Sequence, residues 1–209
     1  MKRNLYLWIV FGVLFLTSDN YAILGIKAGF GISNSSYKGA TYYDNFKLVD
    51  IKGIQYNGKI MFTGLPFFDF DFSSSYIKKS FMLELDILNM DFRQKFDLTI
   101  KSYVFHGKFK LSVPLIPIVP YAGLGIGKYD LDFESKTVIP AIEQLRKYVD
   151  FSDFDSSYGV DAVVGSRFKL MFIPFEPYVE IHYSKIYTPS RYSNIDFISY
   201  EIGILISVF

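Results

Sequence analysis

The chain has 209 residues and a formal net charge of +1, and half of its residues are hydrophobic. It has no cysteine, which excludes disulfides and thiolate metal sites, and its near-neutral charge gives no reason to expect a nucleic-acid partner. Aromatic residues make up 19% of the chain and charged residues 21%, so we expect apolar and charged side chains to alternate closely, as they do on strands.

The first 22 residues begin with two basic side chains, continue with an uncharged apolar run over 5–16 and end with a short polar stretch before Ala22. This is the layout of a secretory signal peptide, and the run is shorter than the ~20 residues of a membrane-spanning helix. We therefore predict a signal peptide over 1–22 and one domain over 23–209. An uncleaved anchor is the alternative.

Alternation with a period of two predicts strands along the rest of the chain. Between Leu24 and Ile32 every second residue is apolar, while Lys27, Gly29 and Gly31 lie among those between them. The second face is small and polar, as the lumen of a narrow barrel requires. The predicted strands are those over about 23–33 and 53–65, one from 68 to about 76, one ending near 113, one that includes 120–127, one over about 156–172, one from 177 and one from about 197 to the end.

The predicted connections alternate in length. Short turns occur at Pro66, Pro114 to Pro117 and Pro174, whereas the other connections, near 34–52, 79–94, 134–155 and 188–196, are longer. Short periplasmic turns and long external loops are typical of bacterial outer-membrane barrels. No segment has 18 consecutive apolar residues, so a membrane would be crossed by strands closed into a barrel. The predicted fold is all-β: a single closed antiparallel up-and-down transmembrane barrel of about eight strands.

Three segments fit this pattern less simply. Residues 80–93 alternate weakly, which indicates either a strand extension or a loop. The apolar parity inverts at Leu98 and Ile100, which indicates a bulge or a part above the bilayer. Apolar residues recur at helical spacing over 138–149, which predicts a short helix in an external loop, with a lid or partner-binding element as the alternative.

The layout of the whole mature chain resembles the outer-membrane protein A/X/W-like group of small bacterial barrels. The residues that carry the resemblance are the alternating glycines that follow the signal peptide, the Pro-Tyr strand starts at Pro120 and Pro177, and the closing strand over 200–209. The resemblance implies export, an outer-membrane location, and contact with outer-membrane lipid, lipopolysaccharide and the barrel-assembly machinery.

The closing strand also resembles the assembly signal of that group, a polar residue and a glycine followed by two large apolar residues at alternate positions. Glu201, Gly203, Ile206 and Val208 match this spacing. Phe209 is an additional residue after the last matching position, whereas the group more often ends on an aromatic residue there.

The predicted inward face is charged and nearly balanced. Charges taken out of water need partners, and a barrel of about eight strands is only just wide enough for its own side chains. We predict a salt-bridged lumen without a wide pore, in which the acids of the third strand face the lysines of the fourth, and Arg167 and Lys169 face Glu180. The residues of this predicted lumen charge network are Lys27, Lys59, Asp69, Asp71, Lys108, Lys110, Asp161, Arg167, Lys169, Glu180 and Glu201.

One triplet, from His182 to Ser184, is similar to the His-x-Ser of lipid A 3-O-deacylases, and Asp196 could then supply the acid of a triad. That family has Asn where this chain has Lys185. We favour the alternative that His182 is a lumenal residue bonded to Glu180, and we expect no enzyme activity. No phosphate loop, metal-ligand cluster or nucleotide fingerprint occurs, so no cofactor and no metal site are predicted.

Four functional classes remain at this point. The first is a structural or adhesive barrel that binds an external protein ligand through Tyr37, Tyr42, Tyr43, Tyr56 and the predicted loop helix. The second is a narrow, porin-like channel or transporter for small or hydrophobic solutes. The third is a lipid A-modifying esterase. The fourth is a secreted lipocalin-like barrel, in which the apolar face would point inward.

Overall fold

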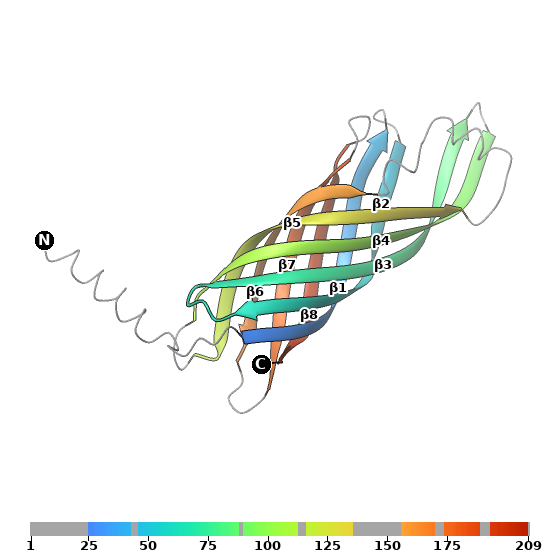
Figure 1. Cartoon of the computed structure of the whole chain (residues 1–209). Coiled ribbons are helices and arrows are strands. Elements are labelled where there is room, and N and C mark those ends of the chain that lie inside the picture. The colour runs from blue at the N-terminus through green and yellow to red at the C-terminus, as the bar shows by residue number, and fades with distance from the viewer. Residues whose placement is uncertain are drawn as a thin grey trace, which may run out of the picture.

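The computed structural model describes residues 25–42, 46–87, 90–112, 116–135, 156–169, 174–188 and 193–208. These residues form one closed antiparallel barrel in which each strand pairs with the next and β8 pairs with β1 (Figure 1). The strands are β1 (Gly25–Tyr42), β2 (Phe46–Thr63), β3 (Phe68–Ile87), β4 (Met90–Lys110), β5 (Ile118–Ser135), β6 (Ser157–Phe168), β7 (Phe175–Tyr187) and β8 (Ile195–Ser207). The predicted all-β up-and-down barrel is confirmed.

Two predicted segments lie outside the described residues, the signal peptide over 1–22 and the helix over 138–149. No helix long and apolar enough to cross a membrane occurs in the part of the chain that the structure describes.

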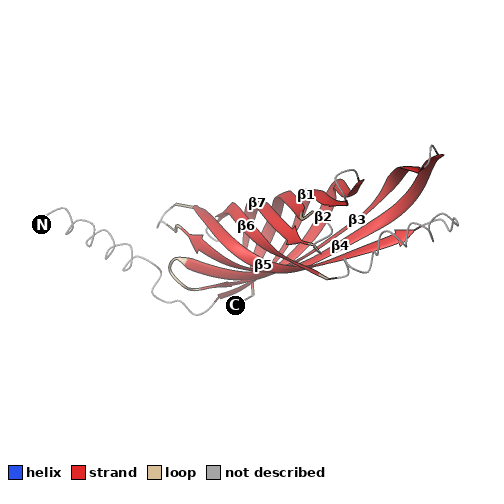
Figure 2. Cartoon of the chain, turned by 90° about the horizontal axis from the view of Figure 1, so that it is seen from above, coloured by secondary structure: helices blue, strands red, loops and turns tan. Residues whose placement is uncertain are grey.

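The strands extend further at one end of the barrel than the sequence predicted. β1 and β2 stay paired up to Tyr42 and Phe46, so most of the predicted loop over 34–52 is strand. β3 and β4 stay paired up to Ile87 and Met90, which resolves the segment 80–93 as a strand extension, and this pair reaches far beyond the barrel body (Figures 1 and 2). Backbone pairing between antiparallel neighbours needs no apolar side chains, so it continues where the alternation fades.

The opposite end is closed by short connections. The turn between β2 and β3 contains Gly64, whose φ of 127° is strained for any residue with a side chain. The Lys110 amide then donates to the carbonyl of Phe67, 2.8 Å away, and the Lys169 amide donates to the carbonyl of Pro117, 2.7 Å away. These turns hold neighbouring strands in register just below the charged part of the lumen.

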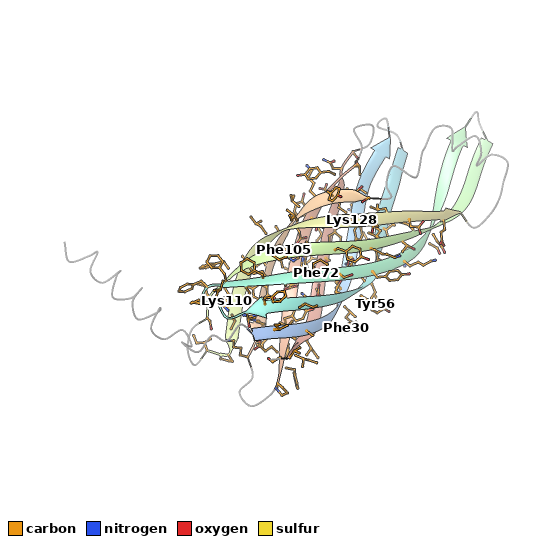
Figure 3. The ribbon with its side chains drawn as sticks, in the orientation of Figure 1. Phe30, Tyr56, Phe72, Phe105, Lys110 and Lys128 are labelled. Carbon is orange, nitrogen blue, oxygen red and sulfur yellow. The ribbon has the colours of Figure 1, made fainter. Side chains whose placement is uncertain are left out.

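The outer face of the barrel is a belt of exposed apolar side chains. Leu124 is 73% exposed and Ile126 68%, and Phe30, Phe72 and Phe105 also lie on the outside (Figure 3). Such a continuous apolar surface is the lipid-facing band of a membrane barrel. The lipocalin-like alternative is therefore wrong, because its apolar face would point inward.

Exposed aromatic residues mark the two borders of this belt. Phenylalanines such as Phe68 and Phe109 lie near the short turns, and tyrosines such as Tyr76, Tyr103 and Tyr158 lie toward the extended end. Aromatic girdles of this kind sit at the two membrane interfaces. The extended strand ends beyond the tyrosines therefore stand outside the membrane.

Candidate functional site

The lumen is filled by side chains in three layers, stacked from the short turns to the extended end. The two layers nearest the turns hold the buried charges together with Met61, Tyr178 and Leu205, and the third layer is an apolar cluster. Each layer comes from the inward positions of the strands, which are every second residue. Between the charged and the apolar side chains lies a lumenal cavity of about 30 Å³, room for roughly one or two water molecules.

The layer nearest the turns is built around Asp69. Lys110 Nζ lies 2.7 Å from Asp69 Oδ1, and Arg167 Nη2 lies 2.6 Å from Asp69 Oδ2. Lys27 pairs beside them with Glu176 at 2.5 Å. Both carboxylate oxygens of a buried acid are thus matched by cations, as a charge removed from water requires.

The next group of charges is built around Glu180, which is 2% exposed. Lys108 Nζ and the Tyr121 hydroxyl donate to Glu180 Oε1 at 2.5 and 2.7 Å, and Lys59 pairs with Oε2. Lys59 also contacts Glu201 at 3.2 Å. Glu180 is therefore the acid that links the most cations in the described lumen.

The predicted pairing between strands holds in one half of the lumen and fails in the other. The third-strand acids do pair with Lys110 and Lys108, since Lys108 lies 2.5 Å from Asp71. Arg167, however, binds Asp69 across the barrel, not Glu180. Glu180 lies opposite Gly165 in the β6–β7 register, and a narrow lumen lets long side chains reach strands that are not neighbours.

Lys169 departs from the prediction in a second way. It follows the end of β6 at the level of the short turns and is only half-buried, so it lies at the rim of the charged layer. The other predicted members of the lumen charge network point inward from their strands.

Inward glycines make the space for these side chains. A Cβ at Gly125 on β5 would lie 2.5 Å from the ring of His106, and a Cβ at Gly203 on β8 would lie 2.4 Å from the Tyr178 hydroxyl. Tyr178 uses that space to donate its hydroxyl to Glu201. Glycine is needed at both positions because a large side chain from a neighbouring strand lies flat across the backbone.

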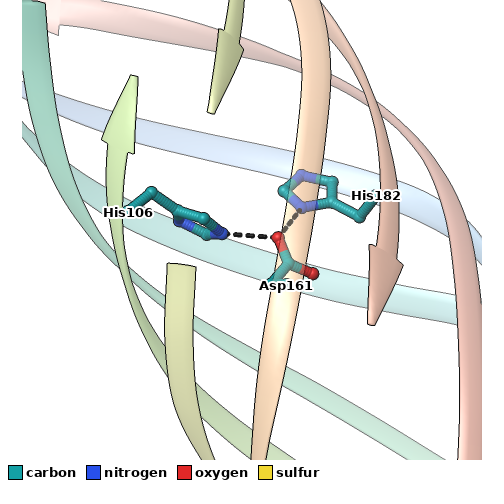
Figure 4. Close-up of side chains that lie close together, drawn as sticks. All are labelled: His106, Asp161 and His182. Carbon is teal, nitrogen blue, oxygen red and sulfur yellow. Dashed lines mark hydrogen bonds and ion pairs between the residues drawn. The ribbon is translucent and has the colours of Figure 1, made fainter. Parts of the chain in front are cut away.

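Above these charges, two imidazoles meet one carboxylate (Figure 4). His106 on β4 and His182 on β7 approach the same atom, Asp161 Oδ1 on β6, at 2.6 and 3.1 Å. The second nitrogen of each ring also has an acid, since His106 Nδ1 lies 2.8 Å from Asp71 and His182 Nε2 lies 3.0 Å from Glu180. Of these contacts, the sequence predicted only the one between His182 and Glu180. His106 and His182 are far apart in the chain, so their meeting was not predicted.

The three weak catalytic candidates do not form a hydrolytic triad in the structure. The Ser184 hydroxyl donates to Asp161 Oδ2, and His182 also bonds to Asp161, so the imidazole does not lie between serine and acid. Asp196 is on the outer face, where it accepts a hydrogen bond from Tyr183 at 3.1 Å. A triad needs the histidine within reach of the serine and oriented by the acid.

The third layer is an apolar cluster that was not predicted. Leu98 and Ile100 point inward and are almost fully buried. The pairing of β4 with β3 is continuous here, so the strand has no bulge and its inward positions stay the same. What changes is the type of residue: the inward positions become apolar. Tyr37 stacks on Phe197 with ring centroids 4.3 Å apart, so it is not on a contact surface as predicted. The other members of the cluster are Ile51, Ile77, Val104, Tyr129, Leu131, Ile186 and Ile195.

The outer face changes character at the same height. Beyond the apolar belt, lysine is the first charged outward residue on six of the eight strands. Lys128 pairs with Asp130 at 3.0 Å and Lys78 with Glu134 at 3.2 Å. We call this group the external lysine ring; its members are Lys38, Lys52, Lys78, Lys101, Lys128 and Lys185.

The residues of the predicted assembly signal lie on β8 and just after it. Glu201 points into the lumen, and Gly203 gives space to Tyr178. Ile206 and Val208 are exposed on the apolar belt. Phe209 lies outside the described residues. Glu201 and Gly203 thus contribute to the lumen, whereas Ile206 and Val208 contribute to the lipid-facing surface.

A closed eight-stranded barrel with an apolar outer belt and a filled lumen is a membrane-spanning β-barrel, and its fold is that of the small outer-membrane barrels of bacteria. No protein-family model and no curated protein sequence matches the chain. Solved structures do match it over almost their whole length, at low sequence identity.

Neisserial surface protein A is 10% identical, with a TM-score of 0.55 and coverage of 87% of this chain and 96% of that one. The attachment invasion locus protein Ail of Yersinia pestis, in complex with the heparin analogue sucrose octasulfate, is 14% identical, with a TM-score of 0.51 and coverage of 88% and 99%. The outer membrane protein AlkL in DMPC bilayers is 13% identical, with a TM-score of 0.53 and coverage of 91% and 93%. The predicted fold group is confirmed by these structures.

Proposed function

We propose that this protein is an occluded outer-membrane barrel that acts through its external rim and not through its lumen. The observation that carries the proposal is the filled lumen, in which salt bridges around Glu180 lie beneath an apolar layer around Leu98 and leave a cavity of about 30 Å³. The β1–β2 and β3–β4 extensions beyond the belt supply surface for an external protein ligand.

Electrical recording tests the occlusion. The purified, folded protein would be inserted into a planar bilayer, with insertion verified by its heat-modifiable gel mobility and a general porin recorded in the same bilayers as a positive control. We expect no steady conductance above that of the bare bilayer. A stable single-channel current would refute the occluded barrel and favour the narrow channel.

We also propose that the external lysine ring binds the phosphate groups of lipopolysaccharide. The ring lies just beyond the exposed tyrosines. If these tyrosines mark the outer membrane interface, the lysines stand at the level of the lipid phosphates. Phosphate is bound by lysine as a point charge, and several lysines at one interface add their attraction. We further propose that the barrel-assembly machinery inserts the protein and that it recognises the predicted assembly signal between Glu201 and Val208.

The lipid partner can be tested with purified lipid A. The variant Lys52→Gln/Lys101→Gln/Lys185→Gln removes three ring lysines for which no acidic partner is described, and Lys169→Gln removes one charge near the short turns as a control. We expect the triple variant in nanodiscs to bind phosphorylated lipid A more weakly, with the control unchanged. Equal binding of phosphorylated and dephosphorylated lipid A by the unmodified protein would contradict the proposal.

A hydrolytic function receives less support from the geometry. The Ser184 hydroxyl donates a hydrogen bond to Asp161 and is fully buried, so neither an activating imidazole nor access for a lipid is present at this hydroxyl. We therefore propose that the protein is not an esterase.

A further inference from the structure

Three donor atoms from three strands converge on one point inside the barrel. His106 Nε2, His182 Nδ1 and Asp161 Oδ1 all lie within 4.8 Å of one another, and all three side chains are buried (Figure 4). We propose that they form a structural binding site for a divalent transition metal ion, with zinc as the metal that this donor set fits best. Two imidazole nitrogens and a carboxylate oxygen are ligands that zinc prefers, whereas calcium and magnesium prefer oxygen alone.

The distances suit a tetrahedral ion. Donors held about 2.0–2.1 Å from zinc at tetrahedral corners stand roughly 3.3–3.4 Å apart. Here the Asp161 oxygen lies 2.6 Å from His106 Nε2 and 3.1 Å from His182 Nδ1. Small side-chain rotations therefore admit the ion, and the strands need not move.

The groups behind the ligands also have the arrangement of a metal site. His106 bonds through its other nitrogen to Asp71 at 2.8 Å, and His182 bonds through its other nitrogen to Glu180 at 3.0 Å. Carboxylates behind ligating histidines fix the tautomer and strengthen the imidazole as a ligand. The second oxygen of Asp161 accepts the Ser184 hydroxyl, which leaves Oδ1 for the metal.

Charge balance gives an independent reason. The connected group around the trio contains four carboxylates, from Asp71, Asp161, Glu180 and Glu201, and two lysines, Lys59 and Lys108. With neutral imidazoles this buried group lacks two positive charges, and buried charges need compensation. One divalent ion bound by the trio supplies both.

The surroundings offer a fourth ligand position. The cavity of about 30 Å³ is lined by the trio and by Tyr129, and it has room for a metal-bound water as the fourth ligand. The Tyr129 hydroxyl also lines this cavity, within reach of such a water. Because the layers above and below close the lumen, we expect the ion to enter while the barrel folds and to link β4, β6 and β7 afterwards.

Metal analysis of refolded protein tests the proposal. The urea-unfolded chain would be refolded with Zn²⁺, treated with a chelator, desalted and analysed by mass spectrometry of its metal content. We expect about one zinc per unmodified chain and none in His106→Gln or His182→Gln. Asp71→Asn, which removes the carboxylate behind His106 and one of the two acids that Lys108 contacts, should lower the affinity by about 10–100-fold.

Two measurements keep the result interpretable if a variant folds poorly. Co²⁺ bound to the unmodified protein should give the strong visible bands of a four-coordinate site. Glu201→Gln is the control: Glu201 is not one of the three ligands and contacts His182 only at Nε2, the nitrogen that faces away from the trio, at 3.7 Å, so this variant should retain zinc. Absence of zinc from the folded, unmodified chain, or zinc lost with Glu201→Gln but kept with His106→Gln, would overturn this site.

Discussion

Replacing Glu180 by Gln should destabilise the barrel more than any other single loss of a lumenal carboxylate charge. Glu180 is 2% exposed and is shared by Lys59 and Lys108, each of which is also buried. Breaking a buried ion pair by removing one partner typically costs about 3–5 kcal/mol. Each lysine keeps a second acid, Glu201 or Asp71, so we place the cost near the lower end, at about 3 kcal/mol, or roughly a hundredfold in the unfolding equilibrium.

Urea unfolding in lipid vesicles, followed by far-ultraviolet circular dichroism, measures this cost. Tryptophan fluorescence is unsuitable because the one tryptophan, Trp8, lies in the predicted signal peptide. Glu176→Gln is the matched control: it is the same change on the same strand, but its pair with Lys27 is partly exposed, so about 1 kcal/mol is expected. Equal losses for the two variants would refute the reasoning that burial decides the cost.

Three further predictions follow from the two faces of the strands. Gly125→Ala should lower the stability by about 1–3 kcal/mol, because its Cβ would lie 2.5 Å from the His106 ring, whereas Gly58→Ala, which meets no atom within 4 Å, should lower it far less in the same unfolding assay. Leu124→Lys, on the 73% exposed lipid face, should cost about 2–4 kcal/mol, and a neutral effect in vesicle unfolding would contradict the placement of the belt. Ser184→Ala should leave lipid A acylation unchanged in cells that express the protein, as judged by mass spectrometry of extracted lipid A, and a difference between the variant and the unmodified protein would restore the esterase hypothesis.

The sequence predicted the barrel and most inward residues because period-two alternation is a local property. Asp71 and Lys108, for example, take their faces from parity alone, and strand order then makes them neighbours. The partners of Arg167 were not predictable in this way, because its contact with Asp69 crosses the barrel and depends on lumen width and side-chain length. The meeting of His106 with Asp161 depends on Gly125, which lies between them in the register of β4, β5 and β6 and leaves room for the imidazole ring.

The exchange of faces at Leu98 fits the export and the membrane insertion that we propose for this chain. A long strand that was apolar on both faces would resemble a membrane-spanning helix, which needs only about 20 apolar residues. Within the membrane the outer face must be apolar, so the inner face carries the charges around Glu180 and must neutralise them. Beyond the tyrosine girdle the outer face turns to lysine at Lys101, and the inner face becomes free to turn apolar at Leu98 and Ile100. The apolar seal over the lumen and the external lysine ring are thus two results of one constraint, which explains why they occur at the same height of the barrel.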